Sequence, residues 1–159
     1  REGTAMISQT MEYALRAMTH LASLGDAVGT SEKLAEATQT PHDYLSKVMR
    51  DLVRAGLVTS TRGRQGGFAL ARPASRISVL DIVNAVEPLR RITSCPLGDP
   101  THTQLCPLHR CLDDALAQIE HAFARNTLSD LVAGAAVPMG CRRLVGVGLA
   151  IDLKRSENH

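Results

Sequence analysis

The sequence has few aromatic residues, little net charge and no long apolar run. Tryptophan is absent and aromatic residues make up 3% of the chain, so the core must consist mostly of aliphatic residues, alanine and methionine. A formal net charge of +2 excludes a protein that coats nucleic acid with its whole surface and leaves room for a local basic patch. No apolar run approaches the roughly 18 residues that a membrane span needs, and no signal peptide is recognisable. We therefore expect a cytoplasmic protein without membrane contact.

The first third of the chain predicts three helices. Apolar residues at helical spacing predict a helix over 10–24. Ser31 is predicted to be the N-cap of a second, short helix. Thr40 is predicted to be the next N-cap, with Pro41 at the first helical position. The third helix has an apolar face and a polar face. The apolar face consists of Leu45, Val48, Met49, Leu52 and Val53. The polar face consists of His42, Ser46, Lys47, Arg50 and Arg54.

A hairpin rich in glycine and arginine follows the third helix. β-like segments at 57–60 and 67–71 flank a loop over 62–66 that contains two arginines and no acid. The pair Gly66 and Gly67 allows backbone to come close to a phosphate. A helix pair followed by a basic hairpin is typical of a winged helix-turn-helix, whose second helix enters the major groove while the wing lies beside it. Double-stranded DNA is therefore the leading candidate partner.

Different residues are expected to position the protein on DNA and to read its bases. Base readers should project from the first turns of the third helix, and they are His42, Ser46 and Lys47. The remaining candidates for DNA contact are Ser31, Thr40, Pro41, Tyr44, Arg50, Arg62, Arg64, Gln65 and Gly66. A wing arginine can also enter a narrow minor groove. For any one of these residues, local packing or a solvated position is about as common as DNA contact. The combination of a helix pair with a basic wing nevertheless favours DNA binding.

The second half of the chain predicts a long amphipathic helix. Ser78 caps a short helix over 79–86, and loop-forming residues follow until Pro107 opens the long helix. Its apolar stripe must bury against something, most simply its own copy in a dimer. The stripe consists of Leu112, Leu116, Ile119 and Phe123. A further short helix is predicted to restart at Thr127.

A group of three cysteines joins the loop to the start of the long helix. Its members are Cys95, Cys106 and Cys111. Thiols in such a chain are more often metal ligands, redox-active groups or buried side chains than a disulfide framework, and a helix N-terminus favours thiolates. His102 and His109 lie in the same segment. The open interpretations are an iron–sulfur cluster, a zinc site, a thiol redox switch, and small apolar side chains at a dimer interface. Three cysteines leave a four-coordinate site one ligand short.

These features together resemble the Rrf2 family of bacterial winged-helix regulators over residues 6–133. The resemblance rests on the segments 8–16, 44–45, 56–58, 62–68 and 77–87. It implies a homodimer with paired winged helices and a crossed dimerisation helix that begins near Pro107. It also implies a transcriptional repressor that binds a palindromic operator. Its DNA affinity would be modulated by an iron–sulfur cluster of unassigned type or by the redox state of its cysteines.

The resemblance also implies a set of metal ligands. Cluster-binding relatives have three cysteines where this chain has Cys95, Cys106 and Cys111. A fourth ligand, which the first helix of the partner subunit donates in some relatives, corresponds to Glu12. Other relatives use a histidine shortly after the third cysteine. His109 lies before the third cysteine of this chain, so it is only a fallback candidate for the fourth ligand. The cysteines here are separated by ten and four residues, whereas relatives commonly have five in both gaps.

We therefore predict a mainly α fold with a small β-hairpin wing, a winged helix-turn-helix followed by a long dimerisation helix. The expected divisions are a vector-derived remnant over 1–5, a DNA-binding domain over 6–90, a cysteine-bearing sensory loop over 91–111, a dimerisation helix region over 107–133 and a tail over 134–159. The role of the tail, which contains Cys141, is unknown.

Three other functions stay open as alternatives. The chain could be a cofactor-free or zinc-binding winged-helix regulator, a thiol- or metal-dependent enzyme, or an adaptor that uses its wing for protein contacts. Against an enzyme, the sequence offers no grouping of serine, histidine and aspartate, no phosphate-cradling glycine loop ahead of a helix and no paired carboxylates in a cleft-like context. His109 and Cys111 imitate a Cys/His pair, but nothing else indicates substrate binding. We therefore expect a regulator without catalytic activity.

Overall fold

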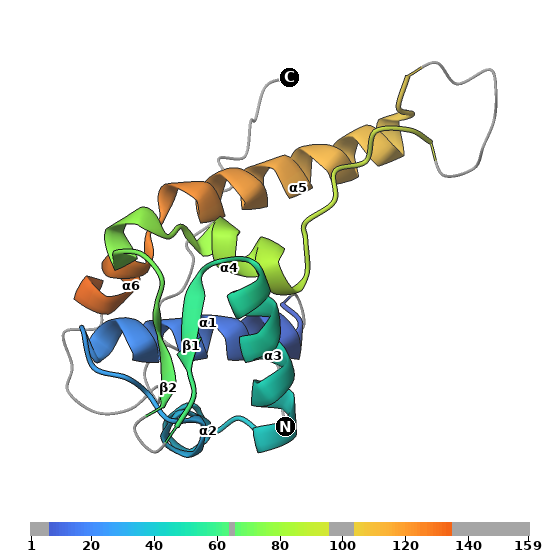
Figure 1. The fold of residues 1–159 in the computed structure, drawn as a ribbon. Helices are drawn as coiled ribbons and strands as arrows, with labels where there is room; N and C mark the ends of the chain where they lie inside the picture. The colour runs from blue at the N-terminus through green and yellow to red at the C-terminus, as the bar shows by residue number, and fades with distance from the viewer. Residues whose placement is uncertain (1–6, 64–65, 96–103, 135–159) are drawn as a thin grey trace.

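The computed structural model describes residues 7–63, 66–95 and 104–134, which form a mainly helical fold with one two-stranded hairpin (Figure 1). This confirms the predicted fold class. No helix in these ranges is both long and apolar enough to cross a membrane. The elements are α1 (Gln9–Ser23), α2 (Ser31–Thr38), α3 (His42–Arg54), β1 (Val58–Thr61), β2 (Gly67–Leu70), η1 (Ala74–Arg76), α4 (Val79–Val86), α5 (Pro107–Arg125) and α6 (Leu128–Gly134).

The core forms around α1, which contacts α2, α3, α4, α6 and β2. Ala14 and Ala17 of α1 are fully buried, and their small side chains allow neighbouring helices to approach closely. Larger side chains fill the space between the helices, as the scarcity of aromatic residues predicts. The largest of them are Met18, Leu21, Leu34, Leu45, Met49, Leu52, Ile77, Ile82 and Leu128.

The start of α3 differs from the sequence prediction. Pro41 is the N-cap, and Thr40 precedes the helix with only 4% of its surface exposed. The Thr40 hydroxyl accepts a hydrogen bond of 3.0 Å from the Thr38 hydroxyl, so it faces the turn between the two helices and caps nothing. The predicted N-cap at Ser31 is also wrong, because Thr30 accepts the bond from the Lys33 amide and Ser31 is the first helical residue.

The wing is an antiparallel hairpin fastened to the loop before α2. Val58 pairs with Leu70 and Thr61 with Gly67 in its register, within one residue of the predicted segments. Phe68 exchanges two backbone hydrogen bonds of 2.9 Å with Gly29. A Cβ atom on Gly67 would lie 2.5 Å from the Gly29 carbonyl oxygen, so glycine is required where these two segments meet.

The chain returns to the winged helix after α5. The Val79 amide donates to the Asn126 carbonyl at 2.9 Å, and the Leu128 amide donates to the Ile77 carbonyl at 2.8 Å. Leu128 is fully buried in the same core as α1 and α3, and burial of such a side chain contributes roughly 1.5–3 kcal/mol. The first turn of α6 therefore completes the core of the preceding domain, which local sequence patterns did not predict.

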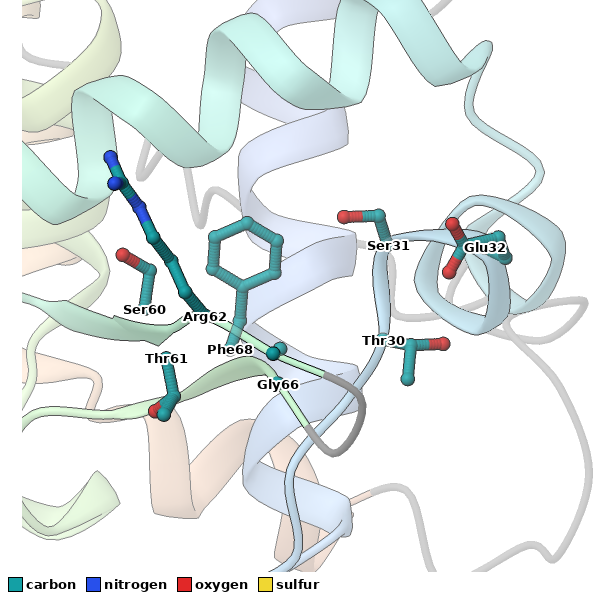
Figure 2. A pocket seen from close by; sticks show the side chains of 10 residues that line it. Thr30, Ser31, Glu32, Ser60, Thr61, Arg62, Gly66 and Phe68 are labelled. Atoms are coloured by element: carbon teal, nitrogen blue, oxygen red, sulfur yellow. The ribbon is translucent and has the colours of Figure 1, made fainter.

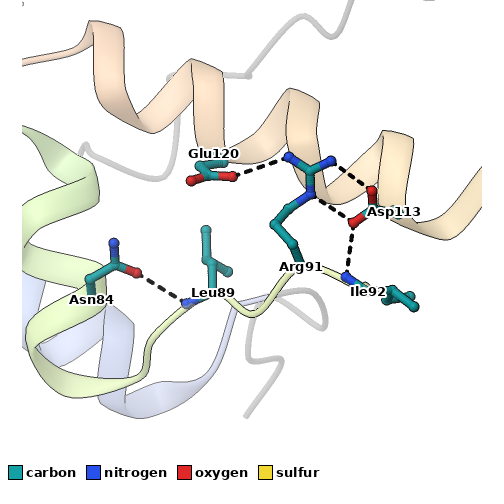
Figure 3. Close-up of polar contacts among 6 residues, drawn as sticks. All are labelled: Asn84, Leu89, Arg91, Ile92, Asp113 and Glu120. Carbon is teal, nitrogen blue, oxygen red and sulfur yellow. Dashed lines mark hydrogen bonds and ion pairs between the residues drawn. The ribbon is translucent and has the colours of Figure 1, made fainter. Parts of the chain in front are cut away.

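An ion pair holds the connection after α4 against the middle of α5 (Figure 3). The Arg91 guanidinium donates two hydrogen bonds to Asp113, at 2.7 and 2.6 Å, and lies 3.5 Å from a Glu120 oxygen. The Ile92 amide also donates to Asp113, at 2.9 Å. The Arg91 side chain and then the Ile92 amide lower the pKa of Asp113 to about 2.

We predict that Gly67→Ala lowers the free energy of unfolding by about 1–3 kcal/mol, because its new methyl group forces the wing away from the loop before α2. Chemical denaturation measures this difference. Gly134→Ala, in α6, is the matched control, since in the described part of the chain no atom outside its own helix and its chain neighbours lies within 4 Å of the added carbon, and it should not lower the free energy of unfolding because alanine is the better helix former. Equal effects of the two substitutions would contradict the close approach at Gly67.

We predict that the ion pair makes stability depend on pH in the acid range. The pKa of Asp113 is about 2 in the folded protein and about 3.9 in an unfolded chain. The contribution of the Asp113 carboxylate to the free energy of unfolding is therefore complete above about pH 4 and is lost as the pH falls toward 2. Asp113→Asn should be less stable than the wild type at neutral pH, and the difference should shrink below about pH 4. Asp114→Asn, an exposed neighbour, is the control, and a difference that is constant with pH would exclude the proposed role.

Candidate nucleic-acid interface and cysteine group

The polar face of α3 is exposed because its apolar face is buried against the core. Leu45, Val48, Met49 and Leu52 are all at most 1% exposed. The predicted base readers and the arginine that follows them point away from these residues and are accessible. They are His42, Ser46, Lys47 and Arg50. The predicted division of α3 into two faces is therefore confirmed.

The exposed side chains of α3 form few hydrogen bonds or ion pairs with other residues of the chain. The Ser46 hydroxyl donates to the His42 carbonyl at 3.0 Å, which leaves its oxygen lone pairs to accept from outside. Arg54 lies 3.4 Å from Asp51. Among the residues that the structure describes, Lys47 and Arg50 form no ion pair. Two cations are thus available to a ligand in front of α3.

Tyr44 and Pro41 lie at the same end of the helix. Pro41 is exposed, and Tyr44 is 37% exposed. The Tyr44 ring packs edge-on against Tyr13 with 5.4 Å between ring centroids, and its hydroxyl lies 3.2 Å from the Thr10 hydroxyl. Tyr44 therefore packs locally and still presents part of its ring and its hydroxyl to the surface.

A hollow of about 410 Å³ separates the wing from the start of α2 (Figure 2). Ser31 lines it from α2, and Arg62 and Gly66 line it from the wing. In Figure 2 the Arg62 side chain extends toward α3, and the Ser31 hydroxyl faces the hollow. Glu32 also lines it, so the hollow is of mixed charge. Arg64 and Gln65, the other predicted wing contacts, lie outside the described residues.

A second group of polar side chains lies at the start of α5. Cys106 is the N-cap of this helix, and His109 follows one turn later. The His109 Nδ1 atom lies 3.1 Å from Cys106 Sγ and 3.8 Å from Cys95 Sγ. The ligand atoms of all three residues lie within 4.8 Å of one another. The structure therefore brings together two predicted cysteine ligands and the histidine that was only a fallback.

The other two predicted metal ligands are not in this group. Cys111 is exposed and is no member of the group. The Glu12 carboxylate pairs with Arg16 four residues later on α1, and Arg16 in turn donates to the Thr38 carbonyl at 3.2 Å. Cys106 is the N-cap and His109 the third residue of α5, two positions whose side chains lie close together at the start of a helix, and this signal was present in the sequence.

Known proteins with similar structures are transcriptional regulators. CymR (YrzC), the global cysteine regulator of B. subtilis, has 25% sequence identity and a TM-score of 0.67, and the match covers 80% of this chain and 96% of that chain. T. potens IscR has 26% identity and a TM-score of 0.69, with 87% and 97% covered. Staphylococcus aureus CymR has 29% identity and a TM-score of 0.60, with 79% and 96% covered.

The family comparison agrees with the structural one. The model of the Rrf2 family, described as an iron-dependent transcriptional regulator, matches residues 7–134. This match spans the winged helix, the cysteine-bearing connection and α5, so it includes both candidate sites. The chain therefore belongs to the Rrf2 family of transcriptional regulators.

Proposed function

We propose that the protein is a homodimeric repressor that binds a palindromic DNA operator through α3, the start of α2 and the wing of each protomer. The observation that carries this proposal is the exposed face of α3, where cations stand beside hydrogen-bonding side chains and toward which the Arg62 side chain extends (Figure 2). Lys47, Arg50 and Arg62 can neutralise phosphates, while His42 and Ser46 can bond to base edges. Because the net charge of the chain is only +2, attraction to the DNA backbone must come from a local group of cations such as this one.

The hollow between the wing and α2 supports a contact to the DNA backbone. In this proposal a phosphate approaches Ser31, the Gly66 backbone and Arg62, where no large side chain on Gly66 stands in the way. Pro41 and Tyr44 border the same surface, and Arg64 and Gln65 extend the wing in sequence. Thr40 is left out, because its hydroxyl is buried and bonded to Thr38.

The apolar side chains at the start of α5 support the dimer. Leu108 is 64% exposed and Leu112 is 47% exposed. None of the residues of α5 is fully buried, although the helix has 19 residues. A second copy that covers this stripe would pair the two winged helices and so match a palindrome of two half-sites.

We further propose that DNA affinity depends on the state of the cysteine-bearing segment, as an iron–sulfur cluster or as thiols that change redox state. A bound cluster would supply a group whose oxidation or loss follows redox conditions. The described residues fit the expected cluster ligands only in part, since Cys111 and Glu12 lie outside the group of Cys95, Cys106 and His109. Any change there can shift DNA affinity only by the difference in binding free energy between the two states.

We predict that DNA binding by this protein is salt-dependent through Arg50 and Arg62. Each phosphate contact contributes about 1 to the slope of log K against log salt concentration. Arg50→Ala and Arg62→Ala should each reduce that slope by about 1, as fluorescence anisotropy with a labelled duplex measures. Arg125→Ala, at the far end of α5, is the matched control and should leave the slope unchanged. An unchanged slope in all three variants would remove this face from the DNA interface.

We predict that polar substitution of the exposed leucines dissociates the dimer. Leu108→Ser combined with Leu112→Ser removes apolar area that is accessible in the single chain, so it should lower dimer affinity without unfolding the winged helix. Sedimentation equilibrium measures the change, and circular dichroism checks the fold. Gln118→Ser, an exposed polar position on α5, is the control. A wild-type monomer at micromolar concentration, or an undiminished dimer in the double variant, would contradict the proposed interface.

A further inference from the structure

We infer that Asp43 selects a cytosine in each half-site of the operator, where its carboxylate accepts a hydrogen bond from the exocyclic amine in the major groove. This inference rests on the proposed function, because it assigns a base contact to the face of α3 that we propose binds DNA. Asp43 follows His42, the first residue of α3. An acid in the first turn of a DNA-binding helix requires a physical reason, since it repels the phosphate backbone.

Asp43 lies on the face of α3 that turns away from the core. Leu52 is fully buried and stands nine positions after Asp43, so the two side chains leave the helix about 180° apart. Ser46 and Lys47, three and four positions after Asp43, lie on the same face as Asp43. All three of these side chains are exposed. The Asp43 carboxylate therefore stands among the side chains that face DNA in the proposed complex.

The Asp43 carboxylate forms no ion pair with any other residue that the structure describes. Lys47 stands one helical turn later, where an acid and a cation can pair, and the two are not paired. Asp51, two turns after Asp43, lies 3.4 Å from Arg54 instead. Asp43 thus keeps its acceptor atoms available to a ligand in front of α3.

Helix capping does not account for an acid at this position. In a capping box the third helical residue accepts a hydrogen bond from the backbone N–H of the N-cap residue, as Asp81 does from Ser78 at α4. The N-cap of α3 is Pro41, which has no N–H, and the third helical residue is Tyr44. What remains is attraction of the Asp43 carboxylate to the helix dipole, which does not depend on the bases of a duplex.

The hydrogen-bonding pattern of the major groove leaves a carboxylate few partners. A carboxylate only accepts hydrogen bonds, and the donors that bases present there are the amines at N4 of cytosine and N6 of adenine. The adenine amine lies between two acceptors, its own N7 and O4 of thymine, whereas the cytosine amine has an acceptor, O6 of guanine, on one side only. Cytosine therefore repels the carboxylate less, and its guanine partner offers O6 and N7 to the Lys47 ammonium.

Selection from a pool of random duplexes by the full-length protein, followed by binding to the selected duplex, tests the role of Asp43. We expect a selected cytosine in each half-site, and its replacement by thymine should weaken wild-type binding by about 5- to 150-fold. Asp43→Ala should bind these two duplexes with affinities that differ by less than about twofold. N4-methylcytosine at that position blocks the amine hydrogen that faces the groove. It should weaken binding by the wild type and leave binding by Asp43→Ala unchanged.

Asp43→Asn separates a base contact from a structural role. Asparagine bonds to N6 and N7 of adenine, so this variant should select adenine in place of cytosine at the same position. A residue that only stabilised α3 would change the affinity for every duplex by one factor and leave the base preference as it was. Chemical denaturation measures the stability of each variant separately. Asp114→Ala removes the same charge from an exposed position on α5. It is the matched control and should keep the wild-type preference.

The outcomes keep this inference distinct from the proposed function. Loss of the cytosine preference in Asp43→Ala, with a gain of adenine preference in Asp43→Asn, supports both. A cytosine preference that persists in Asp43→Ala would overturn the role of Asp43 and leave the DNA-binding proposal intact. Selection of adenine by the wild type at the position that Asp43→Ala relaxes would overturn the assignment of cytosine. Enrichment of no sequence by the wild type would contradict operator binding and this inference together.

Discussion

The packing of the apolar face of α3 against α1 is the constraint on which the remaining structure depends. Ala14 and Ala17 let the helices approach closely, and Leu45 and Met49 fill the space between them. Because α3 has only these two faces, burial of one turns the other toward solvent. The core thus determines which side chains of α3 are exposed for contact with a nucleic acid. Two backbone hydrogen bonds between Gly29 and Phe68 hold the wing beside them.

The same core also fixes the position of α5. Its end is attached where Leu128 enters the core and Asn126 bonds to Val79, and its middle is attached through Arg91 and Asp113. Figure 1 shows the start of α5 projecting beyond the winged helix, away from α2 and the wing. The cysteine group therefore lies away from the DNA face. In our account a change in the cysteine group reaches α3 only through α5, which also carries the proposed dimer interface.

Local patterns predicted most of the elements, and the differences come from particular contacts, some between near neighbours and some between residues far apart in sequence. Helical periodicity and turn residues predicted α1, α3, α5 and the wing, because each carries its own apolar face or glycine pair. The burial of Thr40 depends on the Thr38 hydroxyl in a tight turn, and the place of Leu128 depends on Ile77, which is far away in sequence. Neither leaves a periodic signal. The proximity of Cys106 and His109 follows from their positions as N-cap and third helical residue once Pro107 is taken as the start of α5, whereas counting cysteines alone favoured Cys111.

Hydrogen–deuterium exchange with and without duplex DNA at low salt tests the central claim most directly. The account predicts that DNA slows exchange of backbone amides at the start of α2, in the first turns of α3 and in the strands of the wing. It also predicts little change in α6, whose buried residue faces the core. Protection confined to α5 or α6, with unchanged exchange in α3 and the wing, would contradict the assignment of α3 as the DNA-binding helix.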